Sequence, residues 1–362
     1  MTKPTTFLGA ALAVLAVTGA ARAAPELVMD VSTGQVIHAE EATRPWFPAS
    51  TTKMMTAYVA LRALKAGQVS LDTPLIASAR AASQPPSKIG IRPGQEITLD
   101  NALKILMVKS ANDLALVIAE GIGGSQEGFA RLMNQEAARL GMRESHFVNP
   151  HGLFTPAQVT SARDLAILGR AMLTEFPQFR DYWGIGAVRL GNRVMRNTNG
   201  LIGRYPGAEG MKTGFVCASG FNVVSLASRG GRTILTVVMG AGSGADRTIR
   251  SAQLLDRGFA SWGGGHGTLA SLPGSGHSSA PNMREDICRK GRQLFLGEEE
   301  DTGGSITMPN TDSGSVYAVM MPQPSSSAAR TVGGSGAGGR ATLGARAELP
   351  ATPVFLGRVA GS

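Results

Sequence analysis

Apolar and polar residues alternate at both ends of the chain's central part, and this period of two predicts β-strands. Residues 26–39 alternate on either side of a Ser32-Thr33-Gly34 turn sequence and predict a β-hairpin. The same period returns after Arg204, where residues 210–216, 220–227 and 233–239 are strand candidates. The last two are joined by Gly230-Gly231, a sequence typical of tight hairpin turns.

Between these strands the apolar residues recur at helical spacing. Residues 49–65 predict a helix that ends before Gly67 and carries Ser50 at its N-terminal end. Further helices are expected over residues 100–107, 114–119, 125–141, 165–173 and 247–259. Ser110 falls at the break between two helices, and Ser161-Ala162-Arg163-Asp164 resembles a capping box. Strands at both ends with helices between them predict one α/β (α+β) domain over residues 24–262.

The first residues have the pattern of a secretory signal. Lys3 is followed by an apolar run over residues 7–17 and by the cleavage-type sequence Ala21-Arg22-Ala23. The run is short for a membrane-spanning anchor. We therefore expect a signal peptide over residues 1–23 that is removed near Ala23, with export to the periplasm or cell envelope.

Glycine, serine and proline dominate the C-terminal part, residues 263–362, and predict a largely disordered tail. Short elements are conceivable over residues 283–296 and 316–321. No stretch of the tail is apolar enough to span a membrane, and none forms a convincing amphipathic anchor. Membrane attachment is therefore left open.

Composition and charge exclude some classes of function. Hydrophobic residues make up 43% of the chain and the formal net charge is +9, while mean hydropathy is near zero, as in a globular protein. The charge suits anionic partners such as wall polymers or lipid headgroups, although a solvated basic surface is the simpler interpretation. Nucleic acid is disfavoured, because the basic residues are dispersed and no basic run is interleaved with aromatics.

Cys217 and Cys288 are the chain's two cysteines. In an exported protein they either form a disulfide or remain two thiols, one of them a small buried apolar residue. Two cysteines are too few for a structural zinc site, and no group of His, Cys, Asp and Glu has metal-ligand spacing. We expect neither a metal nor another cofactor.

Three short strings carry candidate chemistry: Ser50-Thr51-Thr52-Lys53, Ser110-Ala111-Asn112 and Lys212-Thr213-Gly214. A helical turn brings the amine of Lys53 to the face of Ser50, where it can take the hydroxyl proton. Burial and the cation of Lys212 both disfavour the charged form of Lys53, as a base requires. The backbone amides of Ser50 and Phe215 are the expected donors to an oxyanion.

With these strings the chain resembles the D-alanyl-D-alanine carboxypeptidases of the low-molecular-mass penicillin-binding protein family, over about residues 25–260. Five longer strings carry the resemblance, at residues 47–54, 108–113, 149–153, 161–164 and 210–214. The resemblance implies a β-lactamase/transpeptidase-like fold, an antiparallel sheet with a helical cluster. It also implies peptidoglycan stem peptides as substrates and β-lactam antibiotics as covalent inhibitors.

The resemblance further assigns roles to single residues. Ser50 would be acylated by the penultimate D-alanine, Lys53 would act as the base, and Ser110 would pass a proton to the departing D-alanine. Substrate binding falls to the following residues: Asn112, which also orients Lys53, and Lys212, Thr213, Gly214 and Phe215. Arg247 either adds to the grip on the terminal carboxylate or is a surface charge.

Several alternatives remain open. A D,D-endopeptidase acting on wall cross-links would use the same residues. A class A-like β-lactamase needs a glutamate-activated water, and its Glu-x-x-Leu-Asn string is absent between Ser110 and Lys212. A catalytically silent wall-binding module is disfavoured by the intact strings. His151 is a candidate base, but Pro150-His151-Gly152 is more typical of a turn.

Overall fold

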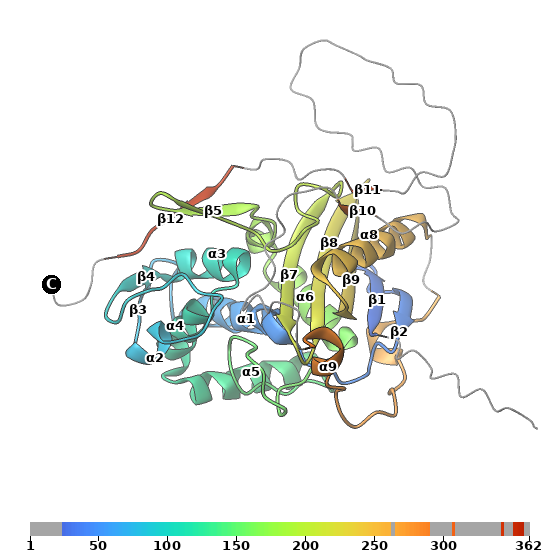
Figure 1. The fold of residues 1–362 in the computed structure, drawn as a ribbon, viewed down its shortest axis with the longest axis horizontal. Coiled ribbons are helices and arrows are strands. Elements are labelled where there is room, and N and C mark those ends of the chain that lie inside the picture. The colour runs from blue at the N-terminus through green and yellow to red at the C-terminus, as the bar shows by residue number, and fades with distance from the viewer. Residues whose placement is uncertain (1–23, 262–264, 290–305, 308–341, 344–349, 358–362) are drawn as a thin grey trace, which may run out of the picture.

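The computed structural model describes residues 24–261, 265–289, 306–307, 342–343 and 350–357. These residues form a central sheet that is covered by helices on both faces, with a helical cluster beside it (Figure 1). The expected signal peptide lies outside the described residues, as does most of the expected tail. The predicted domain boundary at residue 262 therefore stays a prediction.

The central sheet has five strands in the order β2-β1-β9-β8-β7, and every neighbouring pair is antiparallel. Its strands are β1 (Glu26–Asp30), β2 (Val36–Glu40), β7 (Ala208–Val216), β8 (Gly220–Arg229) and β9 (Arg232–Ala241). The expected hairpin and the three later strands are thus confirmed. Because β1 pairs with β9, the two ends of the domain meet in one sheet, and β7 is left at the edge nearer the helical cluster.

All six expected helices form, most of them a few residues longer than predicted. The helices, with short 3-10 turns marked η, are η1 (Ala49–Thr51), α1 (Thr52–Lys65), α2 (Ala79–Ala82), α3 (Leu99–Lys109), α4 (Asn112–Gly123), α5 (Gln126–Leu140), α6 (Ala162–Glu175), η2 (Pro177–Phe179), α7 (Arg180–Trp183), α8 (Gly244–Ala260), η3 (Leu269–Ser271) and α9 (Arg284–Ile287). None of the helices in the described part of the chain is long and apolar enough to cross a membrane.

The helix starts follow the sequence rules with one correction. Ser125, Ser161 and Ser243 each accept a hydrogen bond from the backbone amide three residues on, which caps α5, α6 and α8. The expected reciprocal box at Ser161 does not close. The carboxylate of Asp164 instead accepts hydrogen bonds from the backbone amide of Glu144 and from the side chains of Ser145 and Arg163.

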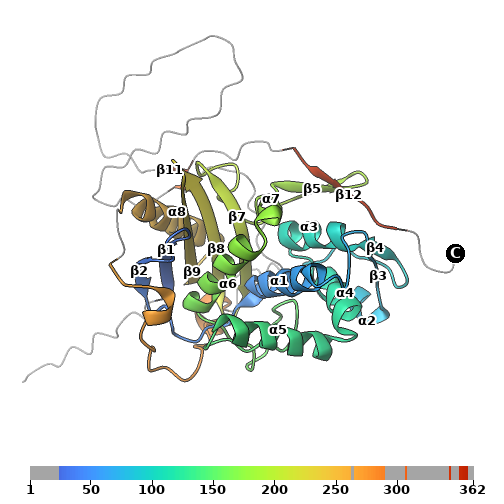
Figure 2. The ribbon, with the colours of Figure 1, turned by 180° about the vertical axis from the view of Figure 1, so that it is seen from behind.

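The hydrophobic core has two parts, one on each face of the sheet. Helix α8 covers one face, where Val28, Ile234 and Val238 are fully buried. Helix α6 lies across the other face (Figure 2), where the larger core begins and continues into the helical cluster. Helix α1 runs through this larger core with most of its side chains buried. The turn η1 that precedes it, which carries Ser50, therefore lies where the sheet and the helical cluster meet.

Seven short strands were not expected from the sequence, because two to four residues are too few to show a period. They are β3 (Pro74–Ile76), β4 (Glu96–Thr98), β5 (Ala187–Leu190), β6 (Arg193–Arg196), β10 (Ile306–Thr307), β11 (Thr342–Leu343) and β12 (Thr352–Val354). Strand β12 comes from the expected disordered tail and pairs in parallel with β5. The side chain of Val354 is fully buried there. This part of the tail packs on the domain.

Residues 265–289 of the expected tail also pack on the domain. Leu269 and Leu272 belong to the larger core, and the carbonyl of Leu269 accepts a hydrogen bond from Arg163 Nε at 2.7 Å. Helix α9 lies within the stretch 283–296, where a short element was expected. The other expected element, residues 316–321, lies outside the described residues.

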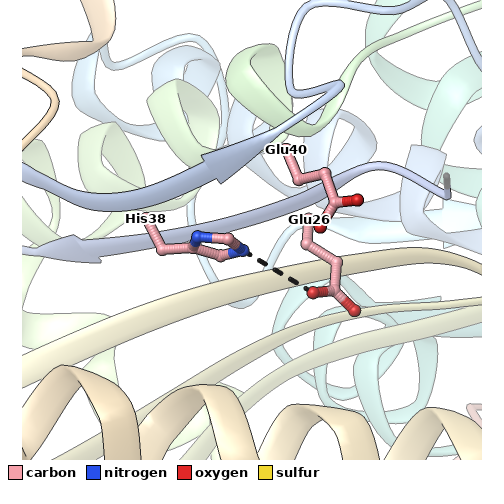
Figure 3. Close-up of side chains that lie close together, drawn as sticks. All are labelled: Glu26, His38 and Glu40. Carbon is pink, nitrogen blue, oxygen red and sulfur yellow. Dashed lines mark ion pairs between the residues drawn. The ribbon is translucent and has the colours of Figure 1, made fainter.

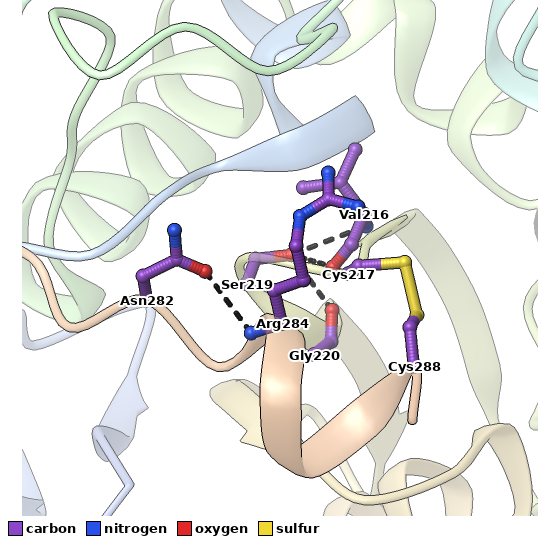
Figure 4. The surroundings of a disulfide bond; sticks show 7 residues. All are labelled: Val216, Cys217, Ser219, Gly220, Asn282, Arg284 and Cys288. Atoms are coloured by element: carbon purple, nitrogen blue, oxygen red, sulfur yellow. Dashed lines mark hydrogen bonds between the residues drawn. A yellow bond between two sulfur atoms is a disulfide. The ribbon is translucent and has the colours of Figure 1, made fainter. Parts of the chain in front are cut away.

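Cys217 and Cys288 form a disulfide between the turn after β7 and the end of α9 (Figure 4). Closing a loop of 71 residues restricts the unfolded chain and contributes roughly 2–4 kcal/mol to stability. The same turn is held by a backbone hydrogen bond of 3.0 Å from Met283 N to the carbonyl of Ala218. The link fixes the tail segment beside the strand that carries Lys212.

Candidate active site

Ser50 lies in η1, the tight first turn that leads into α1, and two glycines allow other segments to approach it. A Cβ at Gly152, which has φ +85°, would lie 1.9 Å from the carbonyl oxygen of Ala49. A Cβ at Gly214 would lie 2.8 Å from the backbone nitrogen of Ser50. Ala49 itself has φ +48°, a conformation that is rare outside glycine and typical of functional sites. The turn around Gly152 and strand β7 therefore both pack closely against the segment that carries Ser50.

Lys53 is fully buried, and its amine contacts three oxygens. Nζ donates hydrogen bonds to Ser50 Oγ at 2.9 Å, to Asn112 Oδ1 at 2.8 Å and to the carbonyl of His151 at 2.7 Å. Ser50 is half-buried, so its hydroxyl can meet a substrate while its partner amine is shielded from water. When the amine is neutral, the same short contact lets it accept the hydroxyl proton.

Asn112 orients Lys53 rather than capping α4. Its amide nitrogen donates to the carbonyls of Pro85 and Pro86 at 2.9 and 3.1 Å, which leaves Oδ1 directed at the lysine amine. The N-cap position of α4 belongs to Ala111. Asn112 therefore does not cap α4.

Asp113 holds the loop that Asn112 contacts, and the sequence alone did not single it out as a functional residue. Its fully buried carboxylate accepts hydrogen bonds from the backbone amides of Ile89, Gly90 and Ile91. We call residues 85–91 the roof loop. Its position is fixed further by a hydrogen bond of 2.7 Å from Asn112 N to the carbonyl of Ser87.

Ser110 lies in the connection between α3 and α4, two residues before Asn112. It is fully buried and has a left-handed backbone with φ +62°. This conformation ends α3 and lets the chain turn into α4. Ser110 is thus part of the short segment that positions Asn112 against Lys53.

The turn that supplies the carbonyl of His151 is held by two amide side chains. Asn149 Oδ1 accepts from Gly152 N at 2.7 Å, and Gln158 Nε2 donates to Thr52 Oγ1 at 3.1 Å and to Asn149 Oδ1 at 3.2 Å. Gln158 is buried and was missed by sequence reasoning. Its link to Thr52 fixes the turn against the start of α1.

The imidazole of His151 is a neutral acceptor within this turn. Burial and the neighbouring cation of Lys53 lower the pKa of His151 to about 3. Its Nδ1 accepts a hydrogen bond from Leu153 N at 3.2 Å. The ring completes the turn, and the backbone carbonyl rather than the ring contacts Lys53.

The sheet side of the site is carried by β7. Lys212 is buried and donates to the carbonyl of Thr213 at 2.9 Å. The hydroxyls of Thr213 and Thr198 are 2.6 Å apart, and Arg247 Nη2 on α8 donates to the carbonyl of Thr198 at 3.3 Å. Arg247 is only 3% exposed, so the alternative that it is a surface charge is wrong. Thr198, which the sequence did not single out, connects it with Thr213.

The segment before Ser50 is fastened to the sheet by Asn222 on β8. Its amide nitrogen donates to the carbonyls of Phe47 and Pro48 at 2.9 and 3.1 Å, and its oxygen accepts from Gly240 N. Asn222 faces Gly214 in the β7–β8 register. The next pair is Phe215 and Phe221, whose rings stack with centroids 4.2 Å apart. The backbone amides of Ser50 and Phe215 thus lie on two segments that Gly214 brings into contact.

The expected site residues therefore fall into two groups around Ser50. Lys53 and Asn112 form one connected set with it on the helical side, and Ser110 lies on the same segment as Asn112. Thr213 and Gly214 lie on β7 with Lys212, and Arg247 joins them through Thr198.

Comparison with known proteins gives one family. Residues 13–243 match the family model described as D-alanyl-D-alanine carboxypeptidase. The chain is 31% identical over 241 residues to D-alanyl-D-alanine carboxypeptidase DacF of Bacillus subtilis, a match that covers 65% of this chain and 62% of that relative. The chain therefore spans about three fifths of the length of this curated relative.

Two solved structures share the fold at comparable identity. Penicillin-binding protein 5 from Haemophilus influenzae superposes with a TM-score of 0.64 at 30% identity, covering 66% of this chain and 71% of that one. Penicillin-binding protein D2 from Listeria monocytogenes in its ampicillin-bound form gives a TM-score of 0.58 at 26% identity, covering 66% of this chain and 97% of that one. The expectation of a transpeptidase-like fold is confirmed.

Proposed function

Since its residues 13–243 match that family model, the chain belongs to the D-alanyl-D-alanine carboxypeptidase family, and from this premise we propose that it removes the terminal D-alanine from peptidoglycan stem pentapeptides. The reaction proceeds through an acyl-enzyme on Ser50. The observation that carries the proposal is the 2.9 Å contact between the buried amine of Lys53 and Ser50 Oγ. A nucleophile paired with a buried base is what serine acyl transfer requires.

Acylation uses the Ser50 hydroxyl, the Lys53 amine, two backbone amides and Ser110. Ser50 Oγ attacks the carbonyl carbon of the penultimate D-alanine while its proton passes to neutral Lys53. The carbonyl oxygen becomes an oxyanion, and the backbone amides of Ser50 and Phe215 stabilise it. When the intermediate collapses, the peptide C–N bond breaks, and the leaving amine takes a proton through Ser110.

Deacylation uses the same groups with water as the nucleophile. Lys53 accepts a proton from the water, hydroxide adds to the acyl carbon, and the Ser50 Oγ–C bond breaks with return of a proton to Oγ. The products are the shortened peptide and a regenerated serine. Asn112 keeps the amine in place through both steps because the roof loop fixes its amide.

Buried groups on β7 and α8 suit the substrate's free carboxylate. Lys212 and Arg247 supply positive charge, and the Thr213 hydroxyl supplies a hydrogen-bond donor between them. A C-terminal carboxylate is the one fixed charge that a terminal D-alanine always carries. The terminal carboxylate is therefore the substrate group that we expect this part of the site to bind.

β-Lactam antibiotics are proposed as covalent inhibitors that acylate the same serine. The Listeria relative was crystallised in an ampicillin-bound form, which supports this assignment. Slow release of the penicilloyl group is expected, because the chain lacks the Glu-x-x-Leu-Asn string of class A β-lactamases between Ser110 and Lys212.

We also propose that the protein works outside the cytoplasm, after removal of residues 1–23. The leader-like sequence supports this location. So does the disulfide between Cys217 and Cys288, since disulfides persist in oxidising compartments. The proposed location is tested by expressing the full chain with its own residues 1–23 and sequencing the N-terminus of the mature protein.

The function is tested by supplying three substrates to the purified protein: a stem pentapeptide, a cross-linked peptide dimer and a penicillin. We expect release of D-alanine from the pentapeptide and none in Ser50→Ala, while Ser70→Ala, at an exposed serine, serves as a matched control. Cleavage of the dimer alone would identify an endopeptidase, and rapid turnover of penicillin a β-lactamase. Failure with all three would identify a silent wall-binding module.

A further inference from the structure

We infer that the outer edge of the sheet carries a binding site for a divalent transition-metal cation of the zinc type, formed by Glu26, His38 and Glu40 (Figure 3). The hairpin register explains why these residues meet. Glu26 on β1 lies directly opposite Glu40 on β2. His38 precedes Glu40 by two residues on the same strand, so both side chains project from the same face.

This site could not be predicted from the sequence, because the spacing of its residues is not that of a metal-binding motif. His38 and Glu40 are close in the chain, but Glu26 joins them only through pairing of β1 with β2. The expectation that no metal-ligand cluster exists rested on sequence spacing alone. In the described part of the chain, this is the one place where three potential ligands of these types converge.

The distances are close to those of a bound ion. His38 Nε2 lies 3.8 Å from Glu26 Oε2, and one ligand atom from each of the three residues lies within 4.8 Å of the others. Zinc bonds of about 2.0–2.2 Å in a tetrahedral arrangement place ligand atoms roughly 3.3–3.5 Å apart. Glu40 is exposed at the end of its strand, so its side chain can make the adjustment of about an ångström that this geometry requires.

Arg250 on α8 prepares Glu26 for this role. Its Nε donates to Glu26 Oε1 at 2.7 Å, which leaves Oε2 directed at His38. A ligand oriented by an outer hydrogen bond is typical of metal sites. Arg250 balances one of the two facing carboxylates, and a cation would balance the second.

The donor set selects the class of ion. One imidazole nitrogen and two carboxylate oxygens suit zinc and its neighbours better than calcium or magnesium, which prefer oxygen ligands alone. A fourth position remains for water. The ring of His266 has its centroid 6.4 Å from that of His38, so a second imidazole is nearby.

The site lies far from the proposed chemistry in the order of the sheet. Strand β2 forms one edge and β7, which carries Lys212, forms the other. A cation there would join β1 to β2 and stabilise the folded chain by mass action rather than take part in acyl transfer. Zinc binding and the acylation of Ser50 can therefore be measured independently of each other.

The test is titration of the tag-free, EDTA-treated protein with zinc chloride by isothermal calorimetry, with cobalt(II) absorption as a second probe. We expect one ion per chain with a dissociation constant in the micromolar range or below. His38→Gln and Glu40→Gln should each weaken zinc binding at least tenfold, as loss of a ligand does. His277→Gln is the matched control, because His277 also lies beside a glutamate, Glu41, at 3.6 Å.

Zinc should also raise the melting temperature of the native chain and of His277→Gln, but not that of His38→Gln. Labelling of Ser50 by fluorescent penicillin shows that each variant is folded. The inference is overturned if the native chain binds no zinc, or if both ligand variants keep its affinity. An equal loss in His277→Gln would likewise overturn it by moving the site elsewhere.

Discussion

The helical and sheet sides of the Ser50 hydroxyl are built by different means. On the helical side, Lys53 is held by oxygens from three separate segments, and Asn112 and Asp113 are fixed through backbone groups of the roof loop. On the sheet side, Lys212 and Thr213 are adjacent residues of one strand, β7, and the hydroxyl of Thr213 contacts that of Thr198.

This difference matches what each side has to do. Proton transfer requires the amine and hydroxyl to be placed within a few tenths of an ångström, and many converging hydrogen bonds achieve that. Holding a carboxylate requires positive charge and a donor of roughly correct direction, which a regular strand supplies. Changes on the helical side should therefore slow acylation, and changes on the sheet side should weaken substrate binding.

The largest effect is expected from Lys53→Met, which removes the base but keeps an unbranched side chain of similar length. Acylation of Ser50 by fluorescent penicillin should slow by about 10³-fold or more, as for other paired nucleophiles that lose their base. Lys65→Met, at an exposed lysine on the same helix, is the control. Acylation within tenfold of the native rate would show that the helical side does not supply the base.

Asp113→Ala tests whether the roof loop matters to the helical side. The change leaves three backbone amides without their acceptor, at a cost of about 2–4 kcal/mol in the free energy of unfolding. Because Asn112 depends on the same loop, acylation by penicillin should slow by about 10–100-fold even at temperatures where the variant is fully folded.

Urea unfolding and the acylation rate are measured on the same samples of this variant. Asp72→Ala, at an exposed aspartate, controls for loss of charge. A variant that is destabilised but acylates at the native rate would separate the roof loop from the chemistry and weaken the distinction between the two sides.

Thr213→Val tests the role of the sheet side in substrate binding. The substitution keeps the shape but removes the hydroxyl that meets Thr198 and faces the proposed carboxylate grip. We expect KM for the pentapeptide to rise about tenfold while kcat changes by less than about threefold, because the loss affects binding in the ground and transition states alike. Thr213→Ser should restore KM. A fall in kcat at constant KM would reverse the roles of the two sides.

The smallest effect on the acylation rate is expected at His151, whose titration instead makes stability depend on pH. Its folded-state pKa of about 3 is below the ordinary value of 6.5, so its contribution to stability is present above pH 6.5 and is lost as pH falls toward 3. In His151→Asn, which retains an acceptor for Leu153 N, this loss should disappear. Acylation at pH 7 should stay within a few-fold of the native rate, because the ring is not the base.

The measurement is the difference in melting temperature between the native chain and His151→Asn across pH 3–7. Asp164 acts in the opposite sense: burial and Glu144 raise its pKa to about 7, so its contribution is lost as pH rises from 4 to 7. That trend is common to both proteins and cancels in the difference. A difference that does not change with pH would show that His151 titrates normally.

The sequence predicted the helices and strands that are long enough to show their hydrophobic period. It also predicted contacts between residues that lie close together in the chain. Ser50 and Lys53 meet because one helical turn separates them, and the long strands and helices showed their periods clearly. The roles expected for the residues near Ser110 and Lys212 came from the family resemblance of the strings that contain them. The central antiparallel sheet, the sequence of helices along the chain and the contact between Ser50 and Lys53 could therefore be expected.

What escaped prediction depends on segments that meet only in the folded chain. Asp113 and Asn222 bind backbone groups of segments that are distant in the sequence, and Gln158 binds the distant hydroxyl of Thr52. No local pattern marks an aspartate, asparagine or glutamine for such a role. Strand β12 is too short to show a period and lies in a sequence rich in small residues. Its position depends on the β5 edge, which the sequence did not reveal either.

Mass spectrometry of the protein after reaction with a penicillin tests whether Ser50 is the nucleophile and Lys53 its base. We expect one penicilloyl group per chain, located by peptide mapping on Ser50, and only trace labelling of Lys53→Met over the same time. Absence of a covalent adduct in the folded native protein, or an adduct on any residue other than Ser50, would contradict it.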